Sequence, residues 1–216
     1  MFSVRVSSKG CKSAGTGPAL LMLIVLELLG LELGWAQEPA QSGIHDEIAK
    51  QEKIYGSRGA DVPSGYVTGR ALPDYGELLS SGFCNALGNL GSSDRWLDIG
   101  AGEGQAILDY YAPEDDAPPA ERCARSAGRA RAVAISIEDR RTEKWQHQAA
   151  RLGERLRYLS GKRLRHYSGE EVGKFQIITD VYGGFSYTED LSQFVEKVLS
   201  LLEIDGLFYT MVQRVH

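Results

Sequence analysis

The sequence has few of the residues that build metal centres. It contains 3 cysteines and 4 histidines in 216 residues, with no CxxC spacing and no clustered histidines. Metal sites that can be found in a sequence show several ligands at short, regular spacings. The sequence therefore predicts no metal site. A chain of this length can also bury a hydrophobic core without disulfide staples.

Positive charge is not in excess either. The chain has 24 Lys and Arg against 29 Asp and Glu, a formal net charge of −5. Proteins that bind nucleic acids usually carry clustered positive charge, so the sequence shows no clear nucleic-acid patch. Hydrophobic residues make up 43% and charged residues 25%, which is ordinary for a globular protein.

No uninterrupted apolar run reaches the roughly 20 residues that a membrane-spanning helix needs. The run at residues 19–26 is followed by Glu27 and Glu32, which would be costly inside a bilayer. Basic residues precede the run, and small residues at Gly34 and Ala36 fit a cleavage site after Ala36. This order is typical of a secretory signal. We predict a signal peptide at residues 1–36, with an N-terminal anchor as the alternative. The protein is then secreted or periplasmic; a mistaken start site would make it cytoplasmic.

Cleavage after Ala36 would leave two cysteines, Cys84 and Cys123. An oxidising compartment would permit them to pair, but nothing in the sequence brings them together. Two buried or idle thiols are the favoured interpretation, and a disulfide is the alternative.

Downstream of a polar linker, helical and strand patterns alternate. Helical spacing predicts helices at residues 44–55, 74–90, 105–111, 139–156 and 189–202. Short apolar runs predict strands at residues 95–99, 132–137, 157–161, 175–180 and 206–212. Such alternation favours a parallel sheet with right-handed crossovers. The predicted fold class is α/β, a three-layer Rossmann-like parallel sheet over residues 95–216, preceded by a helical N-terminal extension at residues 37–94.

Two segments interrupt this alternation. Residues 112–130 hold three prolines and are predicted to be an insertion. Residues 55–70 are rich in glycine. A solvated loop is the favoured interpretation of this second segment; the alternative is a lid or substrate loop in which Arg58 and Arg70 hold an anion.

The first predicted strand runs directly into a glycine-rich turn. Residues 96–104 are Trp-Leu-Asp-Ile-Gly-Ala-Gly-Glu-Gly, and a helix is predicted to begin at Gln105. Glycines in such a turn let a ligand approach the backbone closely. Dinucleotide sites use the spacing GxGxxG, but Gln105 stands where the third glycine would be. Glu103 would also repel a pyrophosphate, so an NAD-binding oxidoreductase is a disfavoured alternative.

This stretch resembles motif I of the class I S-adenosylmethionine-dependent methyltransferases, whose pattern is apolar-apolar-Asp-apolar-Gly-x-Gly-x-Gly. The resemblance covers residues 95–212 and implies S-adenosylmethionine as the cofactor. It also implies that the cofactor contacts residues of this turn, namely Asp98, Gly100, Ala101, Gly102, Glu103 and Gly104.

The resemblance points to the end of the second predicted strand as well. The family has an acid there that bonds the ribose hydroxyls. In this chain Ser136 occupies that place and Glu138 lies just beyond it. Either residue is a candidate ribose contact; the alternative is that Glu138 and Asp139 cap the next helix.

The end of the fourth predicted strand corresponds to the family position that faces the methyl group. The resemblance implies that Asp180 receives a substrate proton or holds the cofactor's amino group. Tyr182 and Tyr187 would form an aromatic wall against the cationic sulfonium. Asp180 and Tyr187 are therefore the predicted catalytic residues, with Tyr182 at the cofactor. The alternative is a glycine-rich turn whose tyrosines pack on the sheet.

One departure from the family concerns the end of the sheet. The family's sheet usually has seven strands and ends in an antiparallel hairpin, which this chain lacks after residues 206–212. An exposed edge there would favour a homo-oligomer. The predicted function is methyl transfer to an unidentified acceptor, with a small molecule as one candidate. A non-catalytic S-adenosylmethionine-binding domain, or a truncated inactive methyltransferase, is the alternative.

Overall fold

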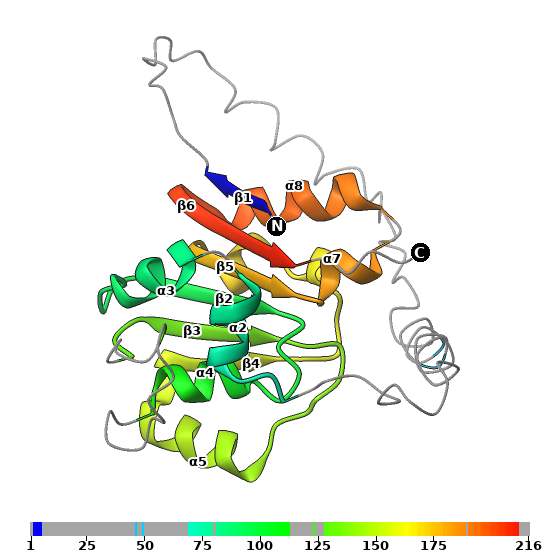
Figure 1. Ribbon diagram of the computed structural model, residues 1–216. Coiled ribbons are helices and arrows are strands. Elements are labelled where there is room, and N and C mark those ends of the chain that lie inside the picture. The colour runs from blue at the N-terminus through cyan, green and yellow to red at the C-terminus, as the bar shows by residue number, and fades with distance from the viewer. Residues whose placement is uncertain are drawn as a thin grey trace, which may run out of the picture.

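The computed structural model describes residues 2–5, 46, 49, 69–79, 81–112, 123, 128–188 and 190–211. These residues form a six-stranded sheet flanked by helices (Figure 1). The strands are β1 (Phe2–Arg5), β2 (Arg95–Ile99), β3 (Arg131–Ile135), β4 (Leu156–Leu159), β5 (Phe175–Val181) and β6 (Leu202–Met211).

The strand order reverses in the middle of the sheet, between β2 and β5. The order is β1-β6-β5-β2-β3-β4, and all neighbours are parallel except β1 and β6. The chain moves outward from β2 to β3 and β4, then crosses back to β5 on the other side of β2. In open α/β sheets, ligands bind where the strand order reverses in this way, beyond the carboxyl ends of the strands. The predicted Rossmann-like α/β class is confirmed.

Helices cover both faces of this sheet, because successive strand residues point to opposite sides. On β2, Trp96 belongs to one hydrophobic cluster and Leu97 to the other. The first cluster includes side chains from α2 (Leu72–Leu78), α3 (Ser81–Gly88), α4 (Gln105–Tyr110) and α5 (Glu143–Leu152). The second includes side chains from the short turn η3 (Leu164–His166), α6 (Gly169–Val172) and α8 (Leu191–Leu201). The result is three layers, as predicted.

Two predicted helices are wrong in extent. The helix predicted at residues 74–90 is two helices, α2 and α3, because Leu79 between them has extended backbone (φ −94°, ψ 174°). The helix predicted at residues 139–156 begins only at Glu143, where the Thr142 hydroxyl accepts a hydrogen bond from Trp145 N (3.2 Å) and caps it. At its other end Leu156 pairs with Ala132 and belongs to β4.

The prediction of an exposed edge after the fifth strand is also wrong for the described residues. Strand β1 pairs antiparallel with β6, and Phe2 lies opposite Thr210. In Figure 1 the arrow of β1 points against those of β5 and β6. This pairing satisfies the backbone groups of β6 that an edge strand would expose. A homo-oligomer remains a prediction.

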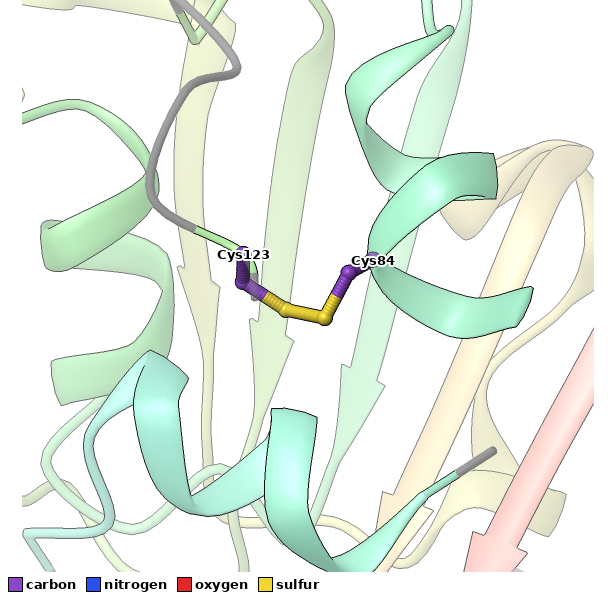
Figure 2. Close-up of a disulfide and its surroundings, with 2 residues drawn as sticks. All are labelled: Cys84 and Cys123. Atoms are coloured by element: carbon purple, nitrogen blue, oxygen red, sulfur yellow. A yellow bond between two sulfur atoms is a disulfide. The ribbon is translucent and has the colours of Figure 1, made fainter. Parts of the chain in front are cut away.

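The sequence favoured two unpaired cysteines, and the structure corrects this. Cys84 on α3 and Cys123 form a disulfide, with their Cα atoms 4.6 Å apart (Figure 2). Both residues belong to the first hydrophobic cluster. The bond therefore ties the predicted insertion at residues 112–130 to the helix layer that packs on β2.

Several predictions fall on residues outside those described. The predicted signal or anchor is outside them apart from residues 2–5, and it stays a prediction. The predicted helix at residues 44–55 is described only at Asp46 and Ala49, both helical. Among the described residues, no helix combines the length and apolar character that a membrane crossing needs. No cluster of three or more potential metal ligands is found in the same part of the chain.

Candidate functional site

The turn after β2 has the backbone that its glycines suggest. Gly100 and Gly104 have φ values of +74°, in the left-handed region that favours glycine. A Cβ added to Gly100 would lie 2.5 Å from Gly183 Cα, and one added to Gly104 would lie 2.3 Å from Trp145 Cζ3. Glycine is thus required at both positions for two reasons: the positive φ, and the close approach of Gly183 and Trp145. The first contact brings the turns after β2 and β5 together at the carboxyl ends of these strands.

Part of this turn is held by the sheet. The N–H groups of Gly100 and Ala101 both donate to the carbonyl of Ile135, at 2.9 and 3.1 Å. Those two donors are therefore occupied by β3. Ala101 is buried, whereas Gly102 and Glu103 are half-buried. The half-buried residues are the part of the turn that remains near the surface.

Asp98 lies beneath the turn in a closed hydrogen-bond network. It is 0% exposed, and its carboxylate accepts hydrogen bonds from the Tyr75 hydroxyl (2.8 Å) and from Thr179 Oγ1 (2.7 Å). The Thr179 hydroxyl in turn accepts from Trp96 Nε1 (2.9 Å). Burial raises the pKa of Asp98 to about 7, and the two hydrogen bonds oppose that rise. In this structure Asp98 links α2 to the sheet.

Asp180 is just as deeply buried at the end of β5. It is 0% exposed; one carboxylate oxygen accepts from Gly183 N (2.8 Å) and the other from Phe185 N (2.9 Å). The pKa of Asp180 is raised to about 7, because burial raises it by more than the two backbone hydrogen bonds lower it. Asp180 thereby holds the turn that carries Tyr182 and Tyr187, both half-buried. Its predicted catalytic role, and that of Tyr187, stay predictions.

The third turn follows β3 and contains the candidate ribose contacts. Ser136 is buried, and its N–H donates to Leu159 O (3.0 Å). The Glu138 side chain is 37% exposed and forms an ion pair with Arg140. Its carboxylate and that of Asp139, which is 47% exposed, are therefore accessible at this end of the sheet, whereas Asp98 and Asp180 are enclosed.

Tyr158 connects this third turn to the glycine turn, a contact that the sequence analysis missed. Its hydroxyl donates to the carbonyl of Gly102 and lies 3.3 Å from the carbonyl of Glu138. The Tyr158 ring also packs edge-on against Trp145, with centroids 5.2 Å apart. Because Tyr158 comes from β4, no local motif relates it to the glycine turn; only the parallel pairing of β3 and β4 does.

Arg70 reaches the same edge from the segment before α2. Its Nη1 donates to the carbonyl of Val181 (3.1 Å), and its guanidinium carbon lies 5.1 Å from the ring centroid of Tyr182. A Cβ added to the preceding Gly69 would lie 3.4 Å from Glu103 Oε2. Residues 69–70 therefore pass from the glycine turn to the end of β5. Arg58, the other predicted anion contact, lies outside the described residues.

The predicted contact residues differ in how well they would fit an amino-acid nucleoside. The glycine turn excludes side chains at two positions, and Glu138 presents an accessible carboxylate suited to hydroxyl groups. Arg70 adds a half-buried cation. Asp98 and Asp180 have their oxygens engaged within the protein. The fit therefore rests on the backbone turn, Glu138 and Arg70.

Comparison with known proteins adds distant structural likenesses only. No protein-family model and no curated protein matches the chain. Among solved structures, 1,6-didemethyltoxoflavin-N1-methyltransferase of Burkholderia thailandensis is 21% identical, with a TM-score of 0.45 over 79% of this chain and 63% of that one. YjhP of Escherichia coli is 18% identical (TM-score 0.41; 61% and 48%). YcgJ of Bacillus subtilis is 22% identical (TM-score 0.41; 60% and 48%). The chain thus spans less than two thirds of the length of each.

Proposed function

We propose that the chain is an S-adenosylmethionine-dependent methyltransferase acting on an acceptor not yet identified. The observation that carries the proposal is the glycine turn of residues 100–104, which lies at the reversal of strand order and resembles the family's motif I. Ligands bind beyond the carboxyl ends of strands at such a point. The half-buried Glu103 in the turn disfavours a pyrophosphate, which argues against a nicotinamide dinucleotide.

The bound cofactor would supply an activated methyl group on a positively charged sulfur. On methyl transfer the carbon–sulfur bond would break with its electrons staying on sulfur, and the acceptor would lose a proton. The protein would contribute mainly by orienting the two reactants. The glycine turn would seat the cofactor, Glu138 or Ser136 would hold the ribose, and Tyr182 and Tyr187 would line the side facing the acceptor.

One observation favours a non-catalytic S-adenosylmethionine-binding domain as the second candidate. Both oxygens of Asp180 already accept backbone hydrogen bonds, from Gly183 and Phe185. Asp180 is also 0% exposed, so a substrate proton could reach it only if the turn of residues 181–187 moved. An acceptor whose proton leaves to water needs no such base, because the methyl group is already activated.

Calorimetric titration of the full chain with S-adenosylmethionine and with NAD tests the proposal. Gly102→Ala should weaken binding of S-adenosylmethionine. Gly153→Ala is a matched control, because Gly102 and Gly153 have φ values of +56° and +57° but Gly153 lies at the end of α5. Both substitutions place a Cβ on a residue with positive φ, a conformation that favours glycine, and only Gly102→Ala should change affinity.

The outcomes separate the candidates. Binding of S-adenosylmethionine alone, weakened only by Gly102→Ala, supports the domain assignment. Release of S-adenosylhomocysteine with an acceptor from a panel of hydroxyl, amine and carbon nucleophiles supports the enzyme; binding without release on any of them supports the second candidate. Binding of NAD in preference, or equal effects of the two substitutions, contradicts the proposal.

A further inference from the structure

The guanidinium of Arg70 has unused hydrogen-bonding capacity. An arginine side chain carries five N–H donors; among the described residues, Nη1 donates to Val181 O and the ring of Tyr182 lies beneath the group. No described carboxylate forms an ion pair with it. A half-buried cation without an acidic partner is suited to an anionic ligand.

The strand order indicates which part of the ligand would reach Arg70. The candidate ribose contacts, Ser136 and Glu138, follow β3, which lies on one side of β2. Arg70 contacts the end of β5, on the opposite side of β2. A ligand with its nucleoside beside β3 and its middle over the glycine turn therefore directs its other end towards β5. In S-adenosylmethionine that end is an amino acid with a free carboxylate.

The position of Gly69 supports this arrangement. The site of its absent Cβ is 3.4 Å from Glu103 Oε2, so residues 69–70 lie beside the turn that would seat the ligand. The charge of Arg70 also lowers the pKa values of Asp98 and Asp180, which lie near the carboxyl ends of β2 and β5. Its hydrogen bond to Val181 places Arg70 beside this edge of the sheet.

We propose that Arg70 binds the α-carboxylate of the cofactor's amino-acid end, through the donors that Val181 leaves unused. This inference rests on the proposed function, since it concerns the same ligand. It assigns a binding contact to a residue outside the glycine turn, on the segment that precedes α2. A bidentate pair between a guanidinium and a carboxylate is geometrically specific, and lysine does not reproduce it.

The test compares two ligands that differ only in the carboxylate: S-adenosylmethionine and decarboxylated S-adenosylmethionine. Both are titrated into the full chain and into Arg70→Ala, Arg70→Gln and Arg70→Lys. The wild-type chain should bind the decarboxylated ligand roughly 10- to 100-fold more weakly, as expected for a charge-assisted hydrogen bond. Arg70→Ala and Arg70→Gln should weaken S-adenosylmethionine by the same factor and leave the decarboxylated ligand unchanged, and Arg70→Lys should restore only part of the affinity.

Arg155→Ala provides a matched control. Arg155 also donates to a backbone carbonyl, that of Arg129 (2.9 Å), and also lies over a tyrosine, with its guanidinium carbon 5.6 Å from the ring of Tyr111. It contacts the segment before β3, at the amino end of the sheet. Arg155→Ala should leave both affinities unchanged. Arg70→Gln serves if Arg70→Ala fails to fold, since it keeps most of the side chain.

Three results would overturn the inference. Equal binding of the two ligands by the wild-type chain would mean that no carboxylate is recognised. Equal loss for both ligands in the Arg70 variants would mean that Arg70 only supports the turn at Val181. No loss in the variants would mean that Arg70 does not touch the ligand. Failure of the wild-type chain to bind either ligand is a different result, because it contradicts the proposed function itself.

Discussion

The hydroxyl of Tyr75 lies 2.8 Å from Oδ2 of Asp98, and both residues are buried, at 2% and 0% exposure. Tyr75 belongs to α2 and Asp98 to β2, so one hydrogen bond joins the helix before the sheet to the strand that leads into the glycine turn. Burial raises the pKa of Tyr75 well above its ordinary value, and the neighbouring Asp98 raises it further. The phenol therefore stays neutral and acts as the donor.

Tyr75→Phe should destabilise the protein by about 1–3 kcal/mol, because a buried carboxyl loses one of its two side-chain donors. Urea denaturation at pH 7 measures the change. Tyr209→Phe is the control, since the Tyr209 ring is buried but no described residue hydrogen-bonds to its hydroxyl. A Tyr75→Phe change no larger than that of the control would mean that the Asp98 contact contributes no stability.

Stability should fall as the pH rises towards neutrality. The pKa values of Asp98 and Asp180 are both raised to about 7 by burial, against an ordinary value of 3.8. Between these values the folded protein binds more protons than the unfolded chain, so raising the pH costs stability, and above pH 7 the effect levels off. Urea midpoints at pH 5, 6, 7 and 8 measure the trend. Asp98→Asn should make the fall shallower and leave the part due to Asp180; a midpoint that rises from pH 5 to pH 7 would contradict the assignment.

Gly104→Ala should destabilise the protein by about 1–3 kcal/mol. The new Cβ would lie 2.3 Å from Trp145 Cζ3 and would sit on a residue with φ +74°, so both overlap and strain contribute. The overlap part is isolated by a double-mutant cycle with Trp145→Leu, in which Gly104→Ala should cost less. Additive effects of the two substitutions would show that the ring does not limit the turn.

Reducing the Cys84–Cys123 disulfide should lower stability by about 2–4 kcal/mol, because the closed segment spans 39 residues. Thermal unfolding with and without dithiothreitol measures the effect. The double variant Cys84→Ser/Cys123→Ser should unfold like the reduced protein and should not respond to the reductant. Peptide mapping of the unreduced chain should recover Cys84 and Cys123 on linked fragments; free thiols at both positions would contradict the pairing.

Removing residues 1–6 should promote self-association, because β6 loses its antiparallel partner β1 and exposes the backbone groups of an edge strand. Light scattering after size-exclusion chromatography compares the shortened and full chains. Lys144→Ser serves as a surface control, since its exposed side chain belongs to α5 and not to the strands β1 and β6. An unchanged mass for the shortened chain would mean that β1 does not protect the edge.

Local patterns were sufficient for the five parallel strands and the turn, but they did not predict β1 at Phe2–Arg5. The predicted strand at residues 95–99 coincides with β2, and the glycine conformations follow from the spacing of residues 100–104. The helix limits were less accurate, because apolar periodicity continues through Leu79 and as far as Leu156. Packing on the sheet decides both limits: the backbone is extended at Leu79, and Leu156 pairs with a strand.

The two buried acids, Asp98 and Asp180, also separate what local patterns predict from what distant residues decide. Their positions at the strand ends were evident from the sequence, but the partners of Asp98 and Asp180 were not. Tyr75 comes from an earlier helix, and the N–H groups that hold Asp180 depend on how residues 181–187 fold back. From the sequence, Arg70 was one of two candidate cations in a glycine-rich segment; its contacts with Val181 and Tyr182 placed it at the carboxyl end of β5.

By itself, the sequence determined which segments form the five parallel strands, where the glycine turn lies and which residues end beside it, because these depend on neighbours along the chain. The tertiary structure alone decided the Cys84–Cys123 bond, the pairing of β1 with β6, and the enclosure of Asp98 by Tyr75. Each of those contacts joins residues far apart in sequence. Their approach depends on how whole elements pack, and no local pattern records it.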